Sequence, residues 1–160
     1  MSSFSPVTVR HYRSADGAAL ARLFAETVRA TESPNYSTDQ LVGWASRAPN
    51  LDLWLSAVAG RSALVAELDS KVVGFATLEP NGHVDHLYVH HRFQRKGAGS
   101  AMLHRMEEEA ASHGLDLLFT EASINARGFF ERSGFQFIAE QVVTINSISL
   151  INYRMEKHLD

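Results

Sequence analysis

The sequence predicts a mixed α/β fold of the α+β type. We expect a central, mostly antiparallel twisted sheet that contains one parallel, splayed strand pair and is flanked by helices. Apolar residues recur at helical spacing before residue 30 and again after residue 97. Between and after these segments the period changes to two, which is typical of strands. The 160 residues, 45% of them hydrophobic, fit a single domain over 1–160.

The first part of the chain predicts a strand, a helix and a short helical insert. Residues 7–13 alternate like a strand, and an amphipathic helix follows over about 18–30. Ser37 and Gln40 have the spacing of a capping box, which would begin a short helix. A further short helix is expected around 53–58.

Three strands follow, connected by tight turns. The segments 62–68 and 71–79 flank Asp69-Ser70, a two-residue hairpin turn. Asn81-Gly82 is a stronger hairpin signal and precedes a strand over 83–91.

The second half predicts a helix, a strand, a short helix and two long strands. The first helix ends near His113, because Gly114 is a natural residue to follow a helix end. The next strand has a continuous apolar run, which is typical of a parallel neighbour, so these elements form one right-handed crossover. The later elements are expected at 115–123, 126–132, 135–145 and 147–159.

Composition excludes several classes of site. The chain has no cysteine, which excludes disulfides, thiolate metal sites and a cysteine nucleophile. A formal charge of −3 gives no broad basic surface, so we expect no nucleic-acid partner. No apolar run is long enough to span a membrane, and no signal peptide is visible. We therefore expect a cytoplasmic protein with no membrane partner.

The stretch FQRKGAGSAM, residues 93–102, predicts an anion site at a helix start. Glycine leaves backbone N–H groups accessible, and the first helical turn has unpaired donors and the positive end of the helix dipole. Phosphate is the usual ligand of such a site. The order of residues matches neither a P-loop nor a dinucleotide loop. The alternative is a helix start that needs glycine only for packing.

Two motifs resemble the GNAT superfamily of N-acetyltransferases, as a small, single-domain member of bacterial type. LYVHHRFQRKGAG resembles its acyl-CoA signature, with Gln94, Gly97 and Gly99 at the fixed positions. NARGFFERSGF is similar to its second signature, except that Asn125 and Ala126 are adjacent here. The order of elements also matches over nearly the whole chain.

The resemblance implies acetyl-CoA (CoA) as co-substrate and no metal. Loop amides would hold the pyrophosphate, and the strand backbone would pair with the pantetheine arm as an added strand does. The N–H of Val89 would be the oxyanion donor. The implied cofactor-binding residues are Leu87, Tyr88, Val89, Gln94, Arg95, Lys96, Gly97, Ala98, Gly99, Ser100, Asn125, Phe129 and Phe130.

Phe130 departs from the family pattern, which often has a tyrosine there that protonates the leaving thiolate. A thiol of pKa about 8.5 leaves tolerably at neutral pH, so the loss slows the reaction without preventing it. Tyr153, or as second choice Tyr88, could supply the hydroxyl. The alternative is that both tyrosines belong to the core or to a substrate wall.

A proton acceptor is expected near the thioester, because an amine of pKa about 10.4 is almost wholly protonated at pH 7. The two-residue period puts His83, Asp85, Leu87 and Val89 on one face of their strand. His86 and Tyr88 fall on the other face. We favour Asp85 with His83, and Glu79 is the third candidate. The alternative is that Asp85 pairs with a cation and His83 ends a hairpin.

The four histidines between residues 83 and 91 also raise a metal site as a possibility. His86 and His90 share a face but would lie about 13 Å apart on a strand. Zinc needs its ligands about 2 Å from the ion, so we expect no metal.

The acceptor is expected to be a primary amine of a small molecule or of a peptide or protein, attacking directly in a ternary complex. Tyr36 and Trp44 are the candidate substrate-binding residues, with simple core packing as the alternative. Other functions left open are a catalytically weak acyl-CoA-binding or sensor module, an aminoacyl-tRNA-directed acetyltransferase, and transfer of a longer acyl group. A homodimer is possible.

Overall fold

The computed structural model describes residues 6–30, 36–40, 62–145 and 147–160. The helices expected within 41–58, and with them Trp44, lie outside the described residues. No helix among the described residues is long and apolar enough to cross a membrane. The helices are α1 (Gly17–Arg29), α4 (Ala98–Ser112) and α5 (Arg127–Arg132), with short 3-10 turns at Ser14–Asp16 and His91–Phe93. The strands are β1 (Thr8–His11), β2 (Ser62–Leu68), β3 (Lys71–Leu78), β4 (His83–Val89), β5 (Leu117–Ser123), β6 (Gln136–Ile145) and β7 (Ile148–His158).

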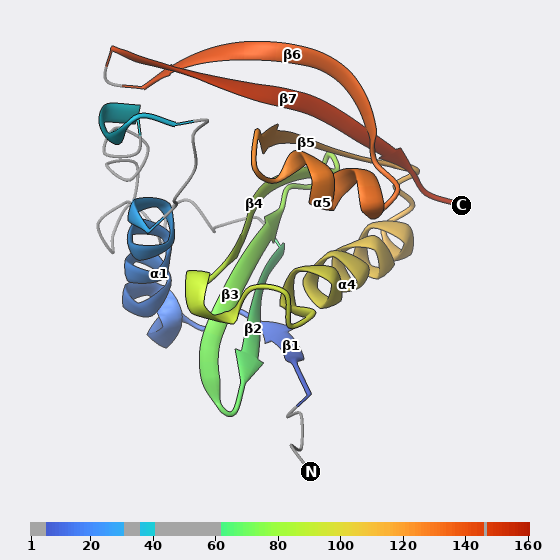
Figure 1. Cartoon of the computed structure of the whole chain (residues 1–160). Coiled ribbons are helices and arrows are strands. Elements are labelled where there is room, and N and C mark those ends of the chain that lie inside the picture. Colours follow the sequence, from blue (N-terminus) through green and yellow to red (C-terminus); the bar gives the residue numbers. More distant parts are fainter. Residues whose placement is uncertain (1–5, 31–35, 41–61, 146) are drawn as a thin grey trace.

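The seven strands form one sheet in the order β1-β2-β3-β4-β5-β7-β6. Every pairing is antiparallel except β4 with β5, which α4 connects. Figure 1 shows α4 and α5 on one side of the sheet, α1 on the other, and the long hairpin of β6 and β7 arching over β5. The predicted fold class and the position of the parallel pair are confirmed.

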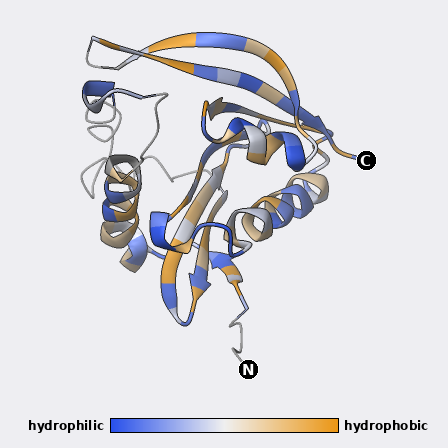
Figure 2. Ribbon diagram, viewed as in Figure 1, coloured by the Kyte–Doolittle hydropathy of each residue, from blue (hydrophilic) through white to orange (hydrophobic). Residues whose placement is uncertain are grey.

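Two apolar layers cover the two faces of the sheet. On one face α4 buries Met102, Leu103 and Met106 against Leu64 and Ala76 of the central strands. On the other face three residues of α1, namely Leu20, Leu23 and Phe24, pack on Val65 and Phe75. Figure 2 shows hydrophobic and hydrophilic residues mixed along β6 and β7, and large hydrophobic side chains of this hairpin are exposed, namely Phe137, Ile138, Val142 and Ile151. The helical faces predicted for α1 and α4 are therefore the buried ones.

Both predicted hairpins form, each with left-handed backbone. Asp69 and Ser70 have φ of 52° and 64°, which fits a two-residue turn between twisted strands. The second turn is longer: the N–H of Gly82 donates to the carbonyl of Glu79 at 3.0 Å, and Gly82 has φ of 96°. Glycine is needed there, because few other residues adopt this conformation without strain.

Gly82 also holds the start of β5 against the turn. Its carbonyl accepts from the N–H of Phe119 at 3.1 Å. A Cβ at this position would lie 2.3 Å from the carbonyl oxygen of Leu117, which is closer than atoms can approach. The turn and β5 are thus in direct backbone contact, and this contact fixes where the parallel pair begins.

One prediction about β4 is wrong: His83 does not share a face with Leu87 and Val89. In the β3–β4 register, Leu78 pairs with Val84 and the next residue, Thr77, pairs with His86. Asp85 is therefore an extra residue, a β-bulge, and a bulge reverses the alternation beyond it. Val84, Leu87 and Val89 all pack toward α4, whereas Tyr88 packs on the α1 side. His83, whose neighbour Val84 faces α4, lies on the opposite face from Leu87.

We predict that Gly82→Ala destabilises the fold by about 1–3 kcal/mol more than Gly114→Ala does, because only the first methyl meets backbone. Gly114 is the matched control, with φ of 76° and nothing within 4 Å of an added Cβ. Urea unfolding of both variants and the parent measures the difference. Equal losses would show that Gly82 is required only for its dihedral angle.

Candidate functional site

The parallel strands β4 and β5 separate soon after they begin. Over their whole described length they pair at two positions, His83 with Phe119 and Val84 with Thr120. The hydroxyl of Thr120 then donates to the carbonyl of Val84 at 2.9 Å. Beyond this point the two strands diverge, so the edge of β4 is left without a strand partner on that side.

The backbone of β4 faces this gap at alternate residues. The N–H of His90 donates to the carbonyl of Val73 at 2.7 Å, so His90 faces β3. Because neighbouring residues of a strand point their N–H groups to opposite sides, those of Leu87 and Val89 face the gap. The gap thus offers the hydrogen-bonding edge that an extended ligand can pair with.

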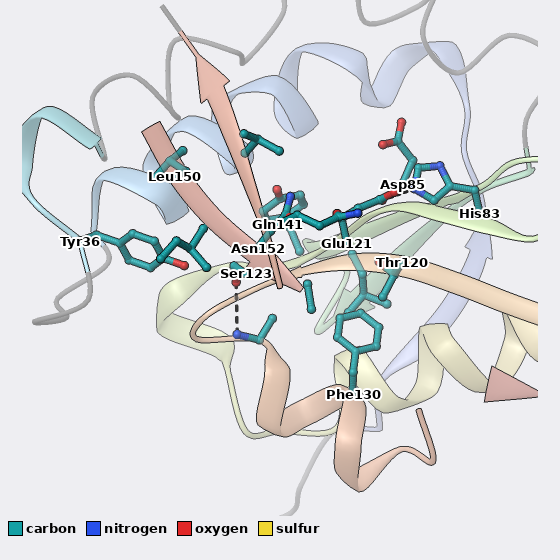
Figure 3. A pocket seen from close by; sticks show the side chains of 16 residues that line it. Tyr36, His83, Asp85, Thr120, Glu121, Ser123, Phe130, Gln141, Leu150 and Asn152 are labelled. Atoms are coloured by element: carbon teal, nitrogen blue, oxygen red, sulfur yellow. Dashed lines mark hydrogen bonds and ion pairs between the residues drawn. The ribbon is translucent and has the colours of Figure 1, made fainter. Parts of the chain in front are cut away.

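A cleft of about 460 Å³ lies at the gap, and residues from both faces of the sheet line it. The side toward α4 and α5 is lined by small or apolar residues, namely Leu87, Ala122, Ala126 and Phe130. The side toward α1 is more polar (Figure 3). Its described lining includes Tyr36, His83, Asp85, Tyr88, Glu121, Ser123, Gln141, Val143, Leu150 and Asn152.

The glycine-rich stretch forms a loop that presents backbone N–H groups at the start of α4. Arg95 and Gly97 both have left-handed backbone, with φ of 63° and 89°. The first helical bond runs from Ala101 to Gly97, so the N–H groups of residues 98–100 precede it. Gly97, the residue before the helix, has no side chain that could cap these N–H groups, and the first helical turn has no acidic residue. These are the features of an anion-binding loop.

The two glycines of the loop are required for different reasons. An added Cβ at Gly97 would have nothing within 4 Å, so only its left-handed dihedral angle favours glycine. An added Cβ at Gly99 would lie 3.3 Å from the ring of Phe129. Packing therefore accounts for Gly99 but not for Gly97. Gln94 connects the loop to the strand, since its side-chain amide donates to the carbonyl of Val89 at 3.3 Å.

His83 lies between two carboxylates at the closed end of the gap. Its Nδ1 is 2.5 Å from a carboxylate oxygen of Glu79, and its Nε2 contacts a carboxylate oxygen of Glu121. Its ring also stacks on Phe119 with centroids 4.9 Å apart. Burial lowers the pKa of His83, but the hydrogen bonds to Glu79 and Glu121 outweigh it and the pKa is raised above its ordinary value. The two carboxylates therefore favour the protonated form of His83.

Asp85 joins this cluster from the bulge. One donor atom from each of Glu79, His83 and Asp85 lies within 4.8 Å of the others. Such a group has the spacing of a cation site, but exposed acidic groups often have it without an ion. The expectation of no metal stays a prediction.

The other predicted catalytic residue, Tyr153, is not among the residues that line the cleft. Its ring packs beside Phe137, with centroids 5.9 Å apart, and lies under the guanidinium of Arg127 at 4.8 Å. Tyr88 does line the cleft, and it packs edge-on against Phe24.

The second motif places Phe130 in the cleft wall and Asn125 in the exposed turn between β5 and α5. Phe130 is buried and contacts Phe129 and Phe135 edge to face, with centroids 5.3 and 5.0 Å away. Phe129 instead packs under the glycine-rich loop. The aromatic pair therefore connects α5 to both the cleft and the loop.

Tyr36, a predicted substrate-binding residue, lines the cleft. It is buried, and its hydroxyl accepts from the N–H of Ile124 at 2.8 Å. Burial raises its pKa. The predicted capping box also forms, with Ser37 and Gln40 bonded to each other's backbone N–H at 3.1 and 2.8 Å. Gln40 further donates to the carbonyl of Ser149 at 2.8 Å, which anchors this segment to β7.

Sequence reasoning missed four polar residues of the cleft. Glu121 belongs to an apolar strand segment, LLFTEAS, where a lone acid was the one available signal. Ser123, Asn152 and Gln141 form a row across β5, β7 and β6, in which each is the direct register partner of the next. Asn152 and Gln141 come from β7 and β6, and no local sequence pattern shows how these strands align with β5.

Comparison with protein families gives a match over most of the chain. The model described as the acetyltransferase (GNAT) domain matches residues 32–157. The chain is also similar to YafP, an N-acetyltransferase of Escherichia coli (strain K12) without an assigned role. The two are 30% identical over 149 residues, which cover 93% of this chain and 94% of that protein.

Solved structures share the fold. A GCN5-related N-acetyltransferase from Rhodopseudomonas palustris aligns with a TM-score of 0.92 and 31% identity, over 99% of both chains. YncA from Salmonella typhimurium, solved with acetyl-CoA, aligns with a TM-score of 0.73 and 23% identity, over 98% of this chain and 95% of that one. PaiA from Thermoplasma acidophilum, solved with coenzyme A, has a TM-score of 0.76 and 19% identity, over 96% and 99%.

We predict that His83 stabilises the fold more at low pH than at high pH. Because the pKa of His83 is raised in the folded state, its contribution is complete below the unfolded value, near 6.5, and is lost as the pH rises through the folded value. The difference in free energy of unfolding between the parent and His83→Gln should therefore shrink from about pH 6 to pH 9. Denaturant unfolding across this range measures it.

The control for His83→Gln is His104→Gln, which removes an exposed histidine of α4. We expect His104→Gln to change the free energy of unfolding by no more than about 0.5 kcal/mol across this pH range. If the loss of unfolding free energy in His83→Gln instead grew with pH, the two carboxylates would not be raising the pKa of His83.

Proposed function

The chain belongs to the GNAT family of acetyltransferases and is an acetyl-CoA-dependent N-acetyltransferase, and from this premise we propose that it acetylates a primary amine by direct attack in a ternary complex. One observation carries the proposal: the cleft lies where β4 and β5 separate, and residues from both faces of the sheet line it. Acetyl-CoA and the amine can therefore approach the same point from opposite faces, with no need for a covalent enzyme intermediate.

The donor half of the cleft suits the thioester end of acetyl-CoA. We assign the pyrophosphate to the N–H groups of the loop from Arg95 to Ser100, where Arg95 and Lys96 add positive charge. The pantetheine arm would pair with the gap-facing backbone of Leu87 and Val89. Acetyl-CoA and coenzyme A bound in the distant relatives YncA and PaiA support this assignment.

The chemistry is transfer of the acetyl group from sulfur to nitrogen. The neutral amine attacks the thioester carbon, the carbon–sulfur bond breaks, and the nitrogen loses one proton, which balances the charge of the departing thiolate. An amine that arrives as an ammonium group loses a further proton before it attacks. The N–H of Val89, which faces the gap, is the proposed donor to the carbonyl oxygen as it gains charge. One such donor is worth about 3–4 kcal/mol in other enzymes.

For the proton we propose the carboxylates at the closed end of the gap. Both ring nitrogens of His83 already contact carboxylates, so neither nitrogen is open to the amine. We propose that His83 positions Glu79 and Glu121, and that Asp85 and Glu121 attract the ammonium group and accept its proton, directly or through water. General base catalysis contributes about 10²–10⁴-fold.

The departing thiolate meets Phe130, which has no proton to give. Of the two tyrosines predicted for this step, Tyr88 lines the cleft but packs on the α1 side, away from the proposed donor half, and Tyr153 does not line the cleft. We therefore propose that neither tyrosine gives the thiolate a proton. A thiol pKa of about 8.5 lets the thiolate leave without one.

We predict that Gly97→Glu lowers the affinity for acetyl-CoA at least about tenfold, because a carboxylate enters the proposed pyrophosphate site. Gly114→Glu is a matched control: both glycines have left-handed backbone and open space around an added Cβ, but Gly114 follows the other end of α4. Calorimetric titration measures both. Equal affinities for the two variants would show that this loop does not bind the pyrophosphate.

We predict that Asp85→Asn lowers kcat/KM for acetylation of a primary amine about 10²-fold, while leaving acetyl-CoA binding unchanged. The control is Asp69→Asn in the β2–β3 turn, where asparagine tolerates the left-handed backbone. Steady-state release of free CoA measures the rate. If neither Asp85→Asn nor Glu121→Gln slows the reaction, the carboxylates are not the proton acceptors.

A further inference from the structure

The acceptor side of the cleft contains one buried oxygen that has no partner within the described residues. This atom is Oδ1 of Asn152, whose side chain lines the cleft. A buried carbonyl oxygen without a hydrogen bond costs about 1–3 kcal/mol, so such atoms are normally satisfied by something. In a cleft wall the missing partner is a donor on a bound ligand or an ordered water.

Asn152 lies in the centre of a polar row. Its direct register partners are Ser123 on β5 and Gln141 on β6, and Figure 3 shows all three near Glu121. On the same face, the next pair along the strands toward Tyr36 is apolar, with Val143 opposite Leu150. The row is therefore the polar part of this wall that lies nearest to the carboxylate cluster.

The charge of the acceptor side is negative among the described residues. Asp85 and Glu121 line the cleft, and no lysine or arginine belongs to its described lining. Arg154, the register partner of Glu121, bonds to Glu156 at 3.0 Å and lies over the ring of Phe119 at 4.0 Å. An acceptor carboxylate would thus find no lysine or arginine in this part of the wall, and both ring nitrogens of His83 already contact Glu79 and Glu121, whereas an ammonium group would find two carboxylates.

We infer that the acceptor is an aliphatic amine that carries a second nitrogen donor and no carboxylate, such as a diamine or a lysine side chain beside another donor. This inference rests on the proposed function. One nitrogen lies at the carboxylates of Asp85 and Glu121, and the second donates to Oδ1 of Asn152. Glu121 and Ser123 are two residues apart on β5, which is about 7 Å. An extended chain with about five bonds between its two nitrogens, as in 1,4-diaminobutane, spans this distance when each nitrogen lies within hydrogen-bond reach of its oxygen.

Three amines of equal chain length test the inference: 1,4-diaminobutane, n-butylamine and 4-aminobutyrate. They differ only in whether the far end is an ammonium group, a methyl group or a carboxylate. With the whole protein and saturating acetyl-CoA, kcat/KM should decrease in that order. We expect the diamine to exceed 4-aminobutyrate at least about 100-fold, because the acid is repelled and leaves Asn152 unpaired.

Two variants identify the residues responsible. Asn152→Leu should lower the ratio of kcat/KM for the diamine over butylamine about tenfold, and Asn152→Asp should restore or increase it. Because each variant is judged by a ratio of two substrates, a general loss of activity does not imitate the effect. Arg154→Gln should not lower the preference for the diamine over 4-aminobutyrate.

The possible failures are distinct. If butylamine or 4-aminobutyrate is acetylated as efficiently as the diamine, or if Asn152→Leu leaves the ratio unchanged, the inference is wrong and the proposed function stands. If no amine, including lysine peptides, releases CoA although acetyl-CoA binds, the proposed function fails and the inference fails with it.

Discussion

The cleft depends on one constraint: β4 and β5 pair for two residues and then stop. Gly82 determines where the β4–β5 pairing begins, because its backbone lies so close to β5 that no side chain fits between them. The hydroxyl of Thr120 then occupies the carbonyl of Val84, where the ladder ends. Every group proposed to act on acetyl-CoA or on the amine lies beyond this point or beside it. A longer ladder would close the gap and satisfy the backbone groups that a ligand needs.

The bulge at Asp85 resolves a conflict within β4. The strand must send Leu87 and Val89 toward α4, where they complete the core beside the glycine-rich loop. It must also bring His83 to the other face, beside Glu121 of β5. Strict alternation cannot do both, since the positions 83, 87 and 89 would share one face. One extra residue satisfies both requirements and leaves the Asp85 carboxylate among the cluster.

Local patterns predicted the parts of the fold that local physics determines. The hairpins at Asp69-Ser70 and Asn81-Gly82, the buried faces of α1 and α4, and the glycine-rich helix start follow from a few neighbouring residues each. The bulge was missed because it appears only in the register with β3. Glu121 and the row of Ser123, Asn152 and Gln141 were missed for the same reason: their positions in the cleft depend on how distant strands align. The catalytic role predicted for Tyr153 stays a prediction, and its side chain packs beside Phe137 and Arg127.

The two faces of the sheet divide the proposed chemistry by polarity. The face toward α4 lines the cleft with Leu87, Ala122 and Phe130, which exclude water from the thioester without offering it a competing charge. The face toward α1 supplies carboxylates and a carboxamide, which hold an amine in place of the water it loses. An ammonium group is attracted to such a wall but reacts only after losing a proton. The carboxylates that attract it are also the groups positioned to take that proton. In the proposed reaction the acetyl group meets the nitrogen at the gap, because the linings of the two faces adjoin there.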